Sequence, residues 1–460
     1  MLAPYRTPIY SATGPASYAP VHRVHQAGLH RAARLWEVAL ILAVLCISGN
    51  PAVQRLADHD ATYAGAAALL ACTLLLRRGD RAVRAFVPVG AVFTMLAVVH
   101  AYAFSVFPII TELGFLTRLF IGMAVVIIIA DFAHTYVVAM VWLSLLSFVF
   151  WIPEYIASWF GIGFHNLFGA LAGRIGPQTA KSWSLGFHTY IISPDQIHRN
   201  AGIFWEPGAF AGYLIIALLI LAAVRPSLTR KQHLSALCIF TGALLSTFST
   251  TGYIAYPIAL LLNFDWRGMN RKHRARLALI AFATAPLVIL GSSYAFVKLD
   301  FLQAKIRHQI TTVERQEQGW RINRLGTLVF DWEYISERPL TGWGINQTTR
   351  FALHPWVADD SNGTGNGMSN FIASFGVIGF GTFLLGLGRG ARRLAGRSPG
   401  YVLGFVAATL LVLQGESFLN CPVFLGLMFL GHASVQGQRL PLLRSSESRN
   451  SARLRCCSYL

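Results

Sequence analysis

The segment from Arg199 to Gly208 places a cation and a carboxylate at the entrance of an apolar run. Glu206, followed by Pro207, predicts the start of a helix, because Pro is tolerated in the first turn and a carboxylate there faces the positive end of the helix dipole. A guanidinium such as Arg199 can hold an anionic group, and a carboxylate can accept a proton. The alternative is an interfacial Arg199 beside a Glu206 that only caps its helix.

A second group of chemically competent residues lies between 321 and 370. Apolar side chains at helical spacing predict an amphipathic helix over residues 321–337, with Arg321 and Arg324 near its start. The segment Arg338-Pro-Leu-Thr-Gly-Trp-Gly344 stops this helix. Its alternative role is an interfacial helix whose arginines meet anionic lipid. The polar residues that follow are His354, Asp359, Asp360 and Asn370.

The composition of the chain indicates which kind of fold positions these residues. Hydrophobic residues make up 54% of the 460 residues and charged residues 13%, against roughly a quarter charged in soluble domains. We therefore expect an all-α, polytopic membrane protein. Apolar runs predict about twelve transmembrane helices, at residues 36–49, 61–76, 85–107, 115–132, 135–152, 203–224, 234–248, 251–264, 277–297, 368–388, 401–418 and 420–435.

The distribution of Lys and Arg indicates the orientation of these helices in the membrane. With the N-terminus in the cytoplasm, all the short basic loops fall on the cytoplasmic side, as the positive-inside rule requires. The net charge of +18 then reports orientation and not nucleic-acid binding. We expect a disordered arm (1–35), a membrane domain (36–435) and a basic tail (436–460), with both termini cytoplasmic. The two long loops, about 153–202 and 298–367, lie outside the membrane, where we expect the functional site.

Other ionisable residues give weaker signals. Arg118 lies inside an apolar run near the outer end of its span, so it is a functional candidate by default, with helix–helix hydrogen bonding as the alternative. Asp359 and Asp360 stand in a Gly- and Asn-rich loop without a further ligand pattern, which favours solvated carboxylates over a metal site. We therefore expect no metal and no cofactor.

Taken in chain order, these features resemble the O-antigen ligase and Wzy-type polysaccharide polymerase superfamily. The motifs that carry the resemblance are the segment 199–207, the span junction Ser249-Thr-Thr-Gly-Tyr253, the Pro339-Leu-x-Gly-x-Gly344 segment, and a span that opens with Gly376-Val-Ile-Gly379. They cover about residues 195–385, while the earlier and later spans fit the superfamily in count and orientation.

The resemblance implies an inverting, metal-independent glycosyltransferase. Its substrates would be glycans linked to undecaprenyl diphosphate at the periplasmic face of the bacterial inner membrane. Negative charge grows on the diphosphate leaving group as the glycosidic bond breaks, so fixed guanidinium groups would stabilise the transition state. Arg199 and Arg324 match the catalytic arginines best. Arg321, Arg118 and Asn370 are the expected substrate-binding residues.

The superfamily includes two activities. Its ligases carry a His in the second long loop, which corresponds here to about 298–367 and is called the late loop below. His354 in this loop is followed by Pro355 and is out of register with the ligase His. This departure favours a polymerase of lipid-linked repeat units, with Glu206 ahead of His354 as the candidate base. A ligase that transfers the finished glycan to lipid A core or another acceptor is the alternative. A secondary transporter is less favoured, since the chain shows no repeated halves. Membrane lipid, a flippase and a chain-length regulator are the expected partners.

The charge distribution makes a testable prediction about topology. Reporter tags at residues 230 and 270 should lie in the cytoplasm, and tags at residues 180 and 315 should lie outside it, because the basic loops stay on the cytoplasmic side. The measurement is the activity of a fused compartment-dependent reporter at each position. A cytoplasmic signal at residue 315 would contradict the orientation.

Overall fold

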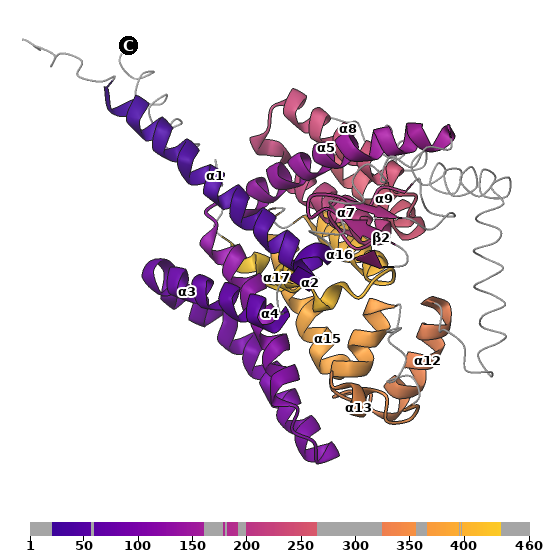
Figure 1. Ribbon diagram of the computed structural model, residues 1–460. Helices are drawn as coiled ribbons and strands as arrows, with labels where there is room; N and C mark the ends of the chain where they lie inside the picture. Colours follow the sequence, from indigo (N-terminus) through magenta and orange to yellow (C-terminus); the bar gives the residue numbers. More distant parts are fainter. Residues whose placement is uncertain are drawn as a thin grey trace, which may run out of the picture.

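The computed structural model describes residues 21–56, 59–160, 178–179, 182–191, 199–264, 324–355, 366–394, 396 and 398–433. These residues form mainly helices (Figure 1). The expected span 277–297, the basic tail, Arg321, Asp359 and Asp360 lie outside the described residues. Helix α1 begins at Val21, within the arm that the sequence predicts to be disordered.

The first half of the chain forms a run of apolar helices: α1 (Val21–Gly49), α2 (Pro51–Leu56), α3 (His59–Phe104), α4 (Ile109–Ile128) and α5 (Phe132–Trp159). Helix α3 contains the expected span 61–76 and the expected span 85–107 up to Phe104. Arg78 separates them, because its backbone leaves helical geometry at φ −153° and ψ 33°. The basic residues around Arg78 therefore occupy a bend between two apolar segments.

A small antiparallel sheet corrects the all-α expectation. Strands β1 (Gln178–Thr179), β2 (Ser182–Ser184) and β3 (Thr189–Ile191) pair in that order within the loop 153–202. Gly186, at φ +84°, allows the turn between β2 and β3. Leu185 and Tyr190 pack against Phe150 of α5, which gives these short strands a hydrophobic support. Strands this short carry too little alternation to be recognised from sequence.

The second half surrounds one central helix. The elements are α7 (Pro207–Val224), η2 (Arg225–Ser227), α8 (Arg230–Ser246), α9 (Thr250–Asn263), α12 (Arg324–Glu337), α13 (Gln347–Arg350), α15 (Gly367–Leu394), α16 (Pro399–Leu413), η4 (Phe418–Asn420), α17 (Pro422–Gly426) and η5 (Leu427–His432). Helix α7 is apolar on all sides and buried along most of its length, as expected of a helix enclosed by others. It contacts α5, α8, α9 and α16.

Five helical segments in the described part of the chain are long and apolar enough to cross a membrane. They are Leu76–Phe104, Ile109–Ile128, Phe132–Trp159, Pro207–Ser227 and Gly367–Leu394, and shorter apolar helices accompany them. Large apolar side chains such as Met95, Trp142 and Leu385 are exposed on these segments, which suits contact with lipid tails. The expected class, a helical multi-pass membrane protein, agrees with this architecture.

Residues 339–344 interlock with a break in helix α15. Gly376 interrupts α15 at φ +63° and ψ −170°, and residues 339–344 bind the main chain exposed on both sides of the break. The hydrogen bonds run from Trp343 N to Ala373 O (2.9 Å), Gly344 N to Ser374 O (2.9 Å), Val377 N to Pro339 O (2.8 Å) and Ile378 N to Leu340 O (3.2 Å). Two motifs that are distant in the sequence therefore form one backbone unit, the 339–378 interlock.

Glycine is required where the two segments meet. A Cβ atom on Gly376 would lie 2.1 Å from Leu340 O, and one on Gly342 (φ +74°) would lie 2.5 Å from Ser374 O. Both contacts are with backbone atoms, which cannot rotate away. Both residues also have positive φ angles, which cost an L-residue about 1–2 kcal/mol.

Replacing Gly376 by Ala should therefore destabilise the folded protein by more than about 2 kcal/mol, since the strained φ angle and the contact with Leu340 O add together. Gly381→Ala is a matched control on the same helix, because its added Cβ would meet nothing within 4 Å. The measurement is thermal unfolding of each purified variant in detergent. Equal stability of the two variants would contradict the requirement for glycine at the interlock.

Candidate functional site

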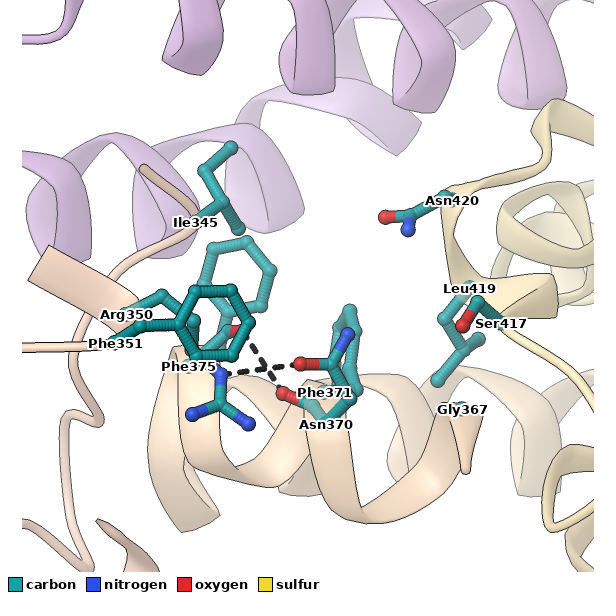
Figure 2. A pocket seen from close by; sticks show the side chains of 11 residues that line it. Ile345, Arg350, Phe351, Gly367, Asn370, Phe371, Phe375, Ser417, Leu419 and Asn420 are labelled. Atoms are coloured by element: carbon teal, nitrogen blue, oxygen red, sulfur yellow. Dashed lines mark hydrogen bonds between the residues drawn. The ribbon is translucent and has the colours of Figure 1, made fainter. Parts of the chain in front are cut away.

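A cavity of about 210 Å³ opens beside the first turns of α15 (Figure 2). Its walls come from α13 and the residue after it, from α15, and from the segment 417–420. The lining residues are Ile345, Arg350, Phe351, Gly367, Asn370, Phe371, Ser374, Phe375, Ser417, Leu419 and Asn420. Aromatic rings, amides and hydroxyls thus share one concave surface, the pattern of a site for a small organic ligand.

Arg350 and Asp331 form a buried ion pair behind one wall of this cavity. Their side chains are 3% and 0% exposed, and Nη2 of Arg350 donates to Oδ1 of Asp331. Nε of Arg350 donates to Oδ1 of Asn370 at 3.0 Å. The guanidinium also lies 4.8 Å from the ring centre of Tyr334 and 5.0 Å from that of Phe351. The cation is therefore held on several sides, and its charge is matched by Asp331.

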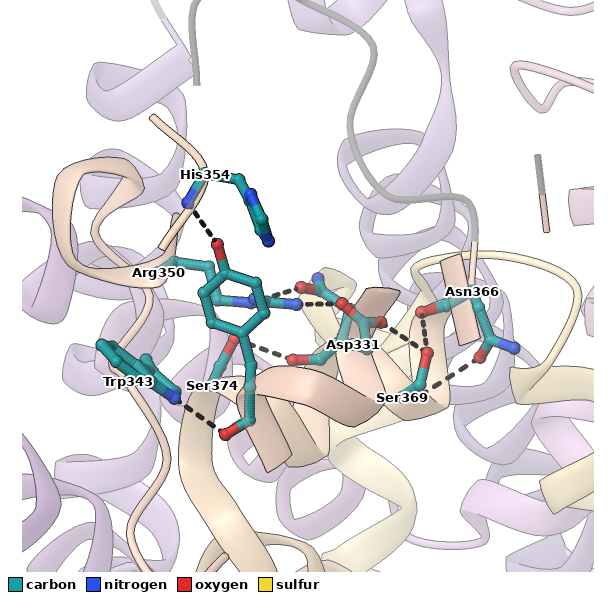
Figure 3. Close-up of polar contacts among 9 residues, drawn as sticks. Asp331, Trp343, Arg350, His354, Asn366, Ser369 and Ser374 are labelled. Carbon is teal, nitrogen blue, oxygen red and sulfur yellow. Dashed lines mark hydrogen bonds and ion pairs between the residues drawn. The ribbon is translucent and has the colours of Figure 1, made fainter. Parts of the chain in front are cut away.

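The other oxygen of Asp331 continues the network into α15 (Figure 3). Ser369 Oγ donates to Asp331 Oδ2 at 2.5 Å. Ser369 N donates to Asn366 Oδ1 at 3.1 Å, and Asn366 Nδ2 donates to Gln414 Oε1 at 2.7 Å. Burial raises the pKa of the Asp331 carboxyl, while Arg350 and the Ser369 hydroxyl lower it in part. The carboxyl thus links the late loop to the start of α15 and the end of α16.

Local contacts orient the two elements that supply this pair. Asn346 caps α13 by accepting from Thr348 N at 3.0 Å, so the short helix presents Arg350 at its end. Trp343 Nε1 donates to Tyr334 O at 2.8 Å and ties α12 to the interlock. His100 of α3 binds Thr341 O through Nε2 at 2.8 Å. Helix α3 therefore supports the late loop from the membrane side.

Arg199 and Glu206 lie in the segment that leads into α7. Nε of Arg199 donates to Thr247 O at 3.0 Å, so this residue contacts the turn between α8 and α9. The adjacent Asn200 donates to Ser147 Oγ and Ser246 Oγ at 2.9 and 3.0 Å. Glu206 is the N-cap residue of α7 but makes no side-chain capping hydrogen bond. The capping alternative for Glu206 therefore lacks its defining contact.

The segment 414–420 connects this region with the cavity. A Cβ on Gly415 would lie 3.0 Å from Thr251 Oγ1, and one on Gly367 would lie 2.0 Å from Glu416 O. The rings of Trp205 and Phe418 lie 6.1 Å apart. One short segment therefore packs against the α7 entrance, the start of α9 and the first turn of α15.

Of the expected site residues that the structure describes, Asn370 alone lines the cavity, and the others lie elsewhere. Arg324 is the first residue of α12. His354 is outside the cavity lining, and its Nε2 lies 2.9 Å from Glu333 Oε2 on a partly exposed surface. Arg118 lies in α4 with its guanidinium 5.2 Å from the Tyr63 ring centre.

Arg350 and Asp331 were not among the residues that the sequence singled out. Asp331 stands on the polar side of the amphipathic pattern, which predicts exposure, but tertiary packing buries it completely. Arg350 stands in a stretch without apolar periodicity. The burial of Asp331 and Arg350 could be found only by knowing that α12 and α13 pack on the same turn of α15.

Comparison with known proteins identifies the class. Residues 234–384 match the family model described as O-antigen ligase. The matched part, about a third of the chain, runs from α8 to α15 and includes the interlock, Asp331, Arg350 and Asn370. No curated protein matches the chain. The match confirms the resemblance found in the sequence, and it places this protein with the membrane glycosyltransferases of the ligase and polymerase type.

The buried ion pair predicts strong coupling between its members. Arg350→Gln leaves Asp331 without its counter-charge and should cost about 3–5 kcal/mol of folding stability. Asp331→Asn together with Arg350→Gln should cost much less than the sum of the two single changes, because no uncompensated charge remains. The measurement is a double-mutant cycle by thermal unfolding in detergent. Additive costs would show that the two side chains do not interact.

Proposed function

We propose that this protein polymerises oligosaccharide repeat units linked to undecaprenyl diphosphate, in the synthesis of an exopolysaccharide or O-antigen. The main support is the family match, which covers Asp331, Arg350 and the cavity residues 345–375 but not the segment 417–420. The reaction would transfer a growing glycan from its diphosphate carrier to a hydroxyl of the next lipid-linked unit. It would need no metal and would invert the configuration at the transferred carbon.

On the donor side, Arg199 and Arg324 would bind the diphosphate. Negative charge develops on this leaving group as the glycosidic bond breaks, and guanidinium groups give paired, charge-assisted hydrogen bonds to phosphate oxygens. The bond from Arg199 Nε to Thr247 O supports this role, because it fixes the direction of the guanidinium plane. Arg321 and Arg118 would add positive charge to the same region.

On the acceptor side, Glu206 would take the proton of the attacking hydroxyl. Its partly exposed position at the start of α7, in the same segment as Arg199, supports this role. His354 is the second candidate. Its Nε2 already contacts Glu333 Oε2 at 2.9 Å, which supports Glu206 ahead of it. Either group would act on a hydroxyl aligned by neighbouring side chains.

The proposed reaction requires a defined membrane arrangement. About twelve spans, cytoplasmic termini and long periplasmic loops would place the site at the outer face of the bacterial inner membrane. A flippase would supply the lipid-linked units there, and a chain-length regulator would act with the polymerase. The second candidate function is ligation of the finished glycan to another acceptor, because the matching family model is itself described as O-antigen ligase.

Substitution of Arg199 and Arg324 by Lys distinguishes a catalytic role from lipid anchoring. If Arg199 and Arg324 bind a diphosphate, Arg→Lys should reduce polymer formation nearly as strongly as Arg→Ala, by at least about a hundredfold, since Lys cannot form paired hydrogen bonds in one plane. The measurement is the amount and length of polymer in a deletion strain complemented at equal membrane abundance. Accumulation of single lipid-linked repeats would mark a loss of polymerisation.

Arg230→Lys is the matched control for this experiment. Arg230 is exposed at the start of α8, and an interfacial arginine can be replaced by Lys, which snorkels equally well. This variant should make normal polymer. Full-length polymer from the Arg199→Lys, Arg324→Lys double variant would refute the diphosphate role. Normal polymer that fails only to reach its final acceptor would favour the ligase.

A further inference from the structure

The cavity beside α15 is nearly neutral despite the arginine in its wall. Among the described residues that line it, Arg350 alone carries a formal charge, and Asp331 compensates that charge from behind. A diphosphate carries at least two negative charges and needs cations that are not already matched. The electrostatics of this cavity therefore favour an uncharged ligand.

Two carboxamides, those of Asn370 and Asn420, line the cavity beside the hydroxyl-bearing residues Ser374 and Ser417. Asn370 uses Oδ1 to accept from Arg350 Nε, which leaves its Nδ2 directed into the open space. Asn420 faces it from η4, and Figure 2 shows both amide groups directed into the cavity. Within the described part of the chain, neither Asn370 Nδ2 nor the Asn420 amide has a hydrogen-bond partner. Amides both donate and accept, as a ligand with several hydroxyl groups requires.

Aromatic rings make much of the rest of the same surface apolar. Phe351, Phe371 and Phe375 line the cavity and are largely buried, so their faces are held in place by the core. The ring carbons of a sugar present C–H groups that pack on aromatic faces, while its hydroxyls point outward to polar partners. An arrangement of rings beside two amides matches that division.

The size of the cavity limits what it can hold. Its volume of about 210 Å³ is below the roughly 300 Å³ at which pockets for drug-sized ligands begin. A single sugar ring fits this space, and the rest of a longer glycan would have to lie outside it.

We infer that this cavity, with Asn370 and Asn420 as its recognition residues, binds one uncharged sugar residue of the glycan and not the diphosphate. The inference rests on the proposed function, which supplies a glycan as substrate. It gives Arg350 a positioning role, since Arg350 orients the Asn370 amide and does not itself meet a phosphate. Sugar selection and leaving-group stabilisation then belong to different parts of the protein.

Asn370→Asp tests this assignment sharply. The carboxylate keeps an oxygen to accept from Arg350 Nε, but it replaces the Nδ2 donor that faces the cavity by a second acceptor. The probes are methyl glycosides of glucose, galactose, mannose, rhamnose and N-acetylglucosamine, without lipid or diphosphate. Saturation-transfer NMR on the full-length protein in nanodiscs measures their binding, and inorganic pyrophosphate is added as competitor.

At least one glycoside should bind the unaltered protein, and Asn370→Asp and Asn420→Ala should each weaken it by about five- to tenfold. Gln347→Ala, an exposed change on α13, should leave binding intact, and pyrophosphate should not compete. Loss of folding in one variant would still leave the other variant and the competition to decide. Absence of binding by every glycoside, unchanged binding in both cavity variants, or displacement by pyrophosphate would overturn the inference.

The result is separable from that of the polymerisation assay. If the deletion strain makes normal polymer while glycosides still bind at Asn370 and Asn420, the proposed function fails and the sugar site stands. If single lipid-linked repeats accumulate in the deletion strain but no glycoside binds, the function stands and the assignment of the cavity fails.

Discussion

Main-chain hydrogen bonds between residues 339–344 and the break in α15 hold the late loop in register with the membrane domain. An interrupted helix exposes carbonyl and amide groups that must find partners within the protein, since lipid supplies none. The late loop satisfies those groups and is fixed by them. Trp343, Tyr334 and α13 then take positions that depend on this attachment. Three residues of the cavity wall adjoin this backbone contact, namely Ile345, Ser374 and Phe375.

The ion pair between Arg350 and Asp331 is the second constraint. Burying two charges is costly unless each is paired and hydrogen-bonded. Here Ser369 binds Asp331 and Asn370 binds Arg350 Nε, while the buried Nη1 of Arg350 has no hydrogen-bond partner among the described residues. A hydrophobic replacement would stabilise the fold as well. What such a replacement could not do is fix the orientation of the Asn370 amide, because orientation needs a donor of defined direction. The pair is best understood as the support of a recognition surface.

Much of the architecture could be predicted from the sequence. Apolar runs located the helices, because length and hydrophobicity are nearly sufficient to define a helix in a membrane. The start of α7 at Pro207 followed from proline, and the bend at Arg78 falls between two of the predicted spans. The small sheet at 178–191 could not be predicted, since its strands depend on support from Phe150 of α5. Asn370 was expected to bind substrate from the family resemblance, and it lines the cavity, whereas the contacts of Arg350 and Asp331 follow only from the packing of α12, α13 and α15. The placement of Arg199, Arg324 and Glu206 around a substrate remains a prediction.

The 339–378 interlock consists of backbone atoms, and this has a consequence for how the protein can vary. Side chains at positions such as Ile345, Phe351 and Asn420 line the cavity without taking part in the interlock. Related chains can therefore exchange these side chains while they keep the glycines at 342 and 376, and the frame survives the exchange. The same separation makes the cavity a practical site for grafting, because wall residues can be exchanged to alter what the cavity binds while the backbone that carries them needs no redesign.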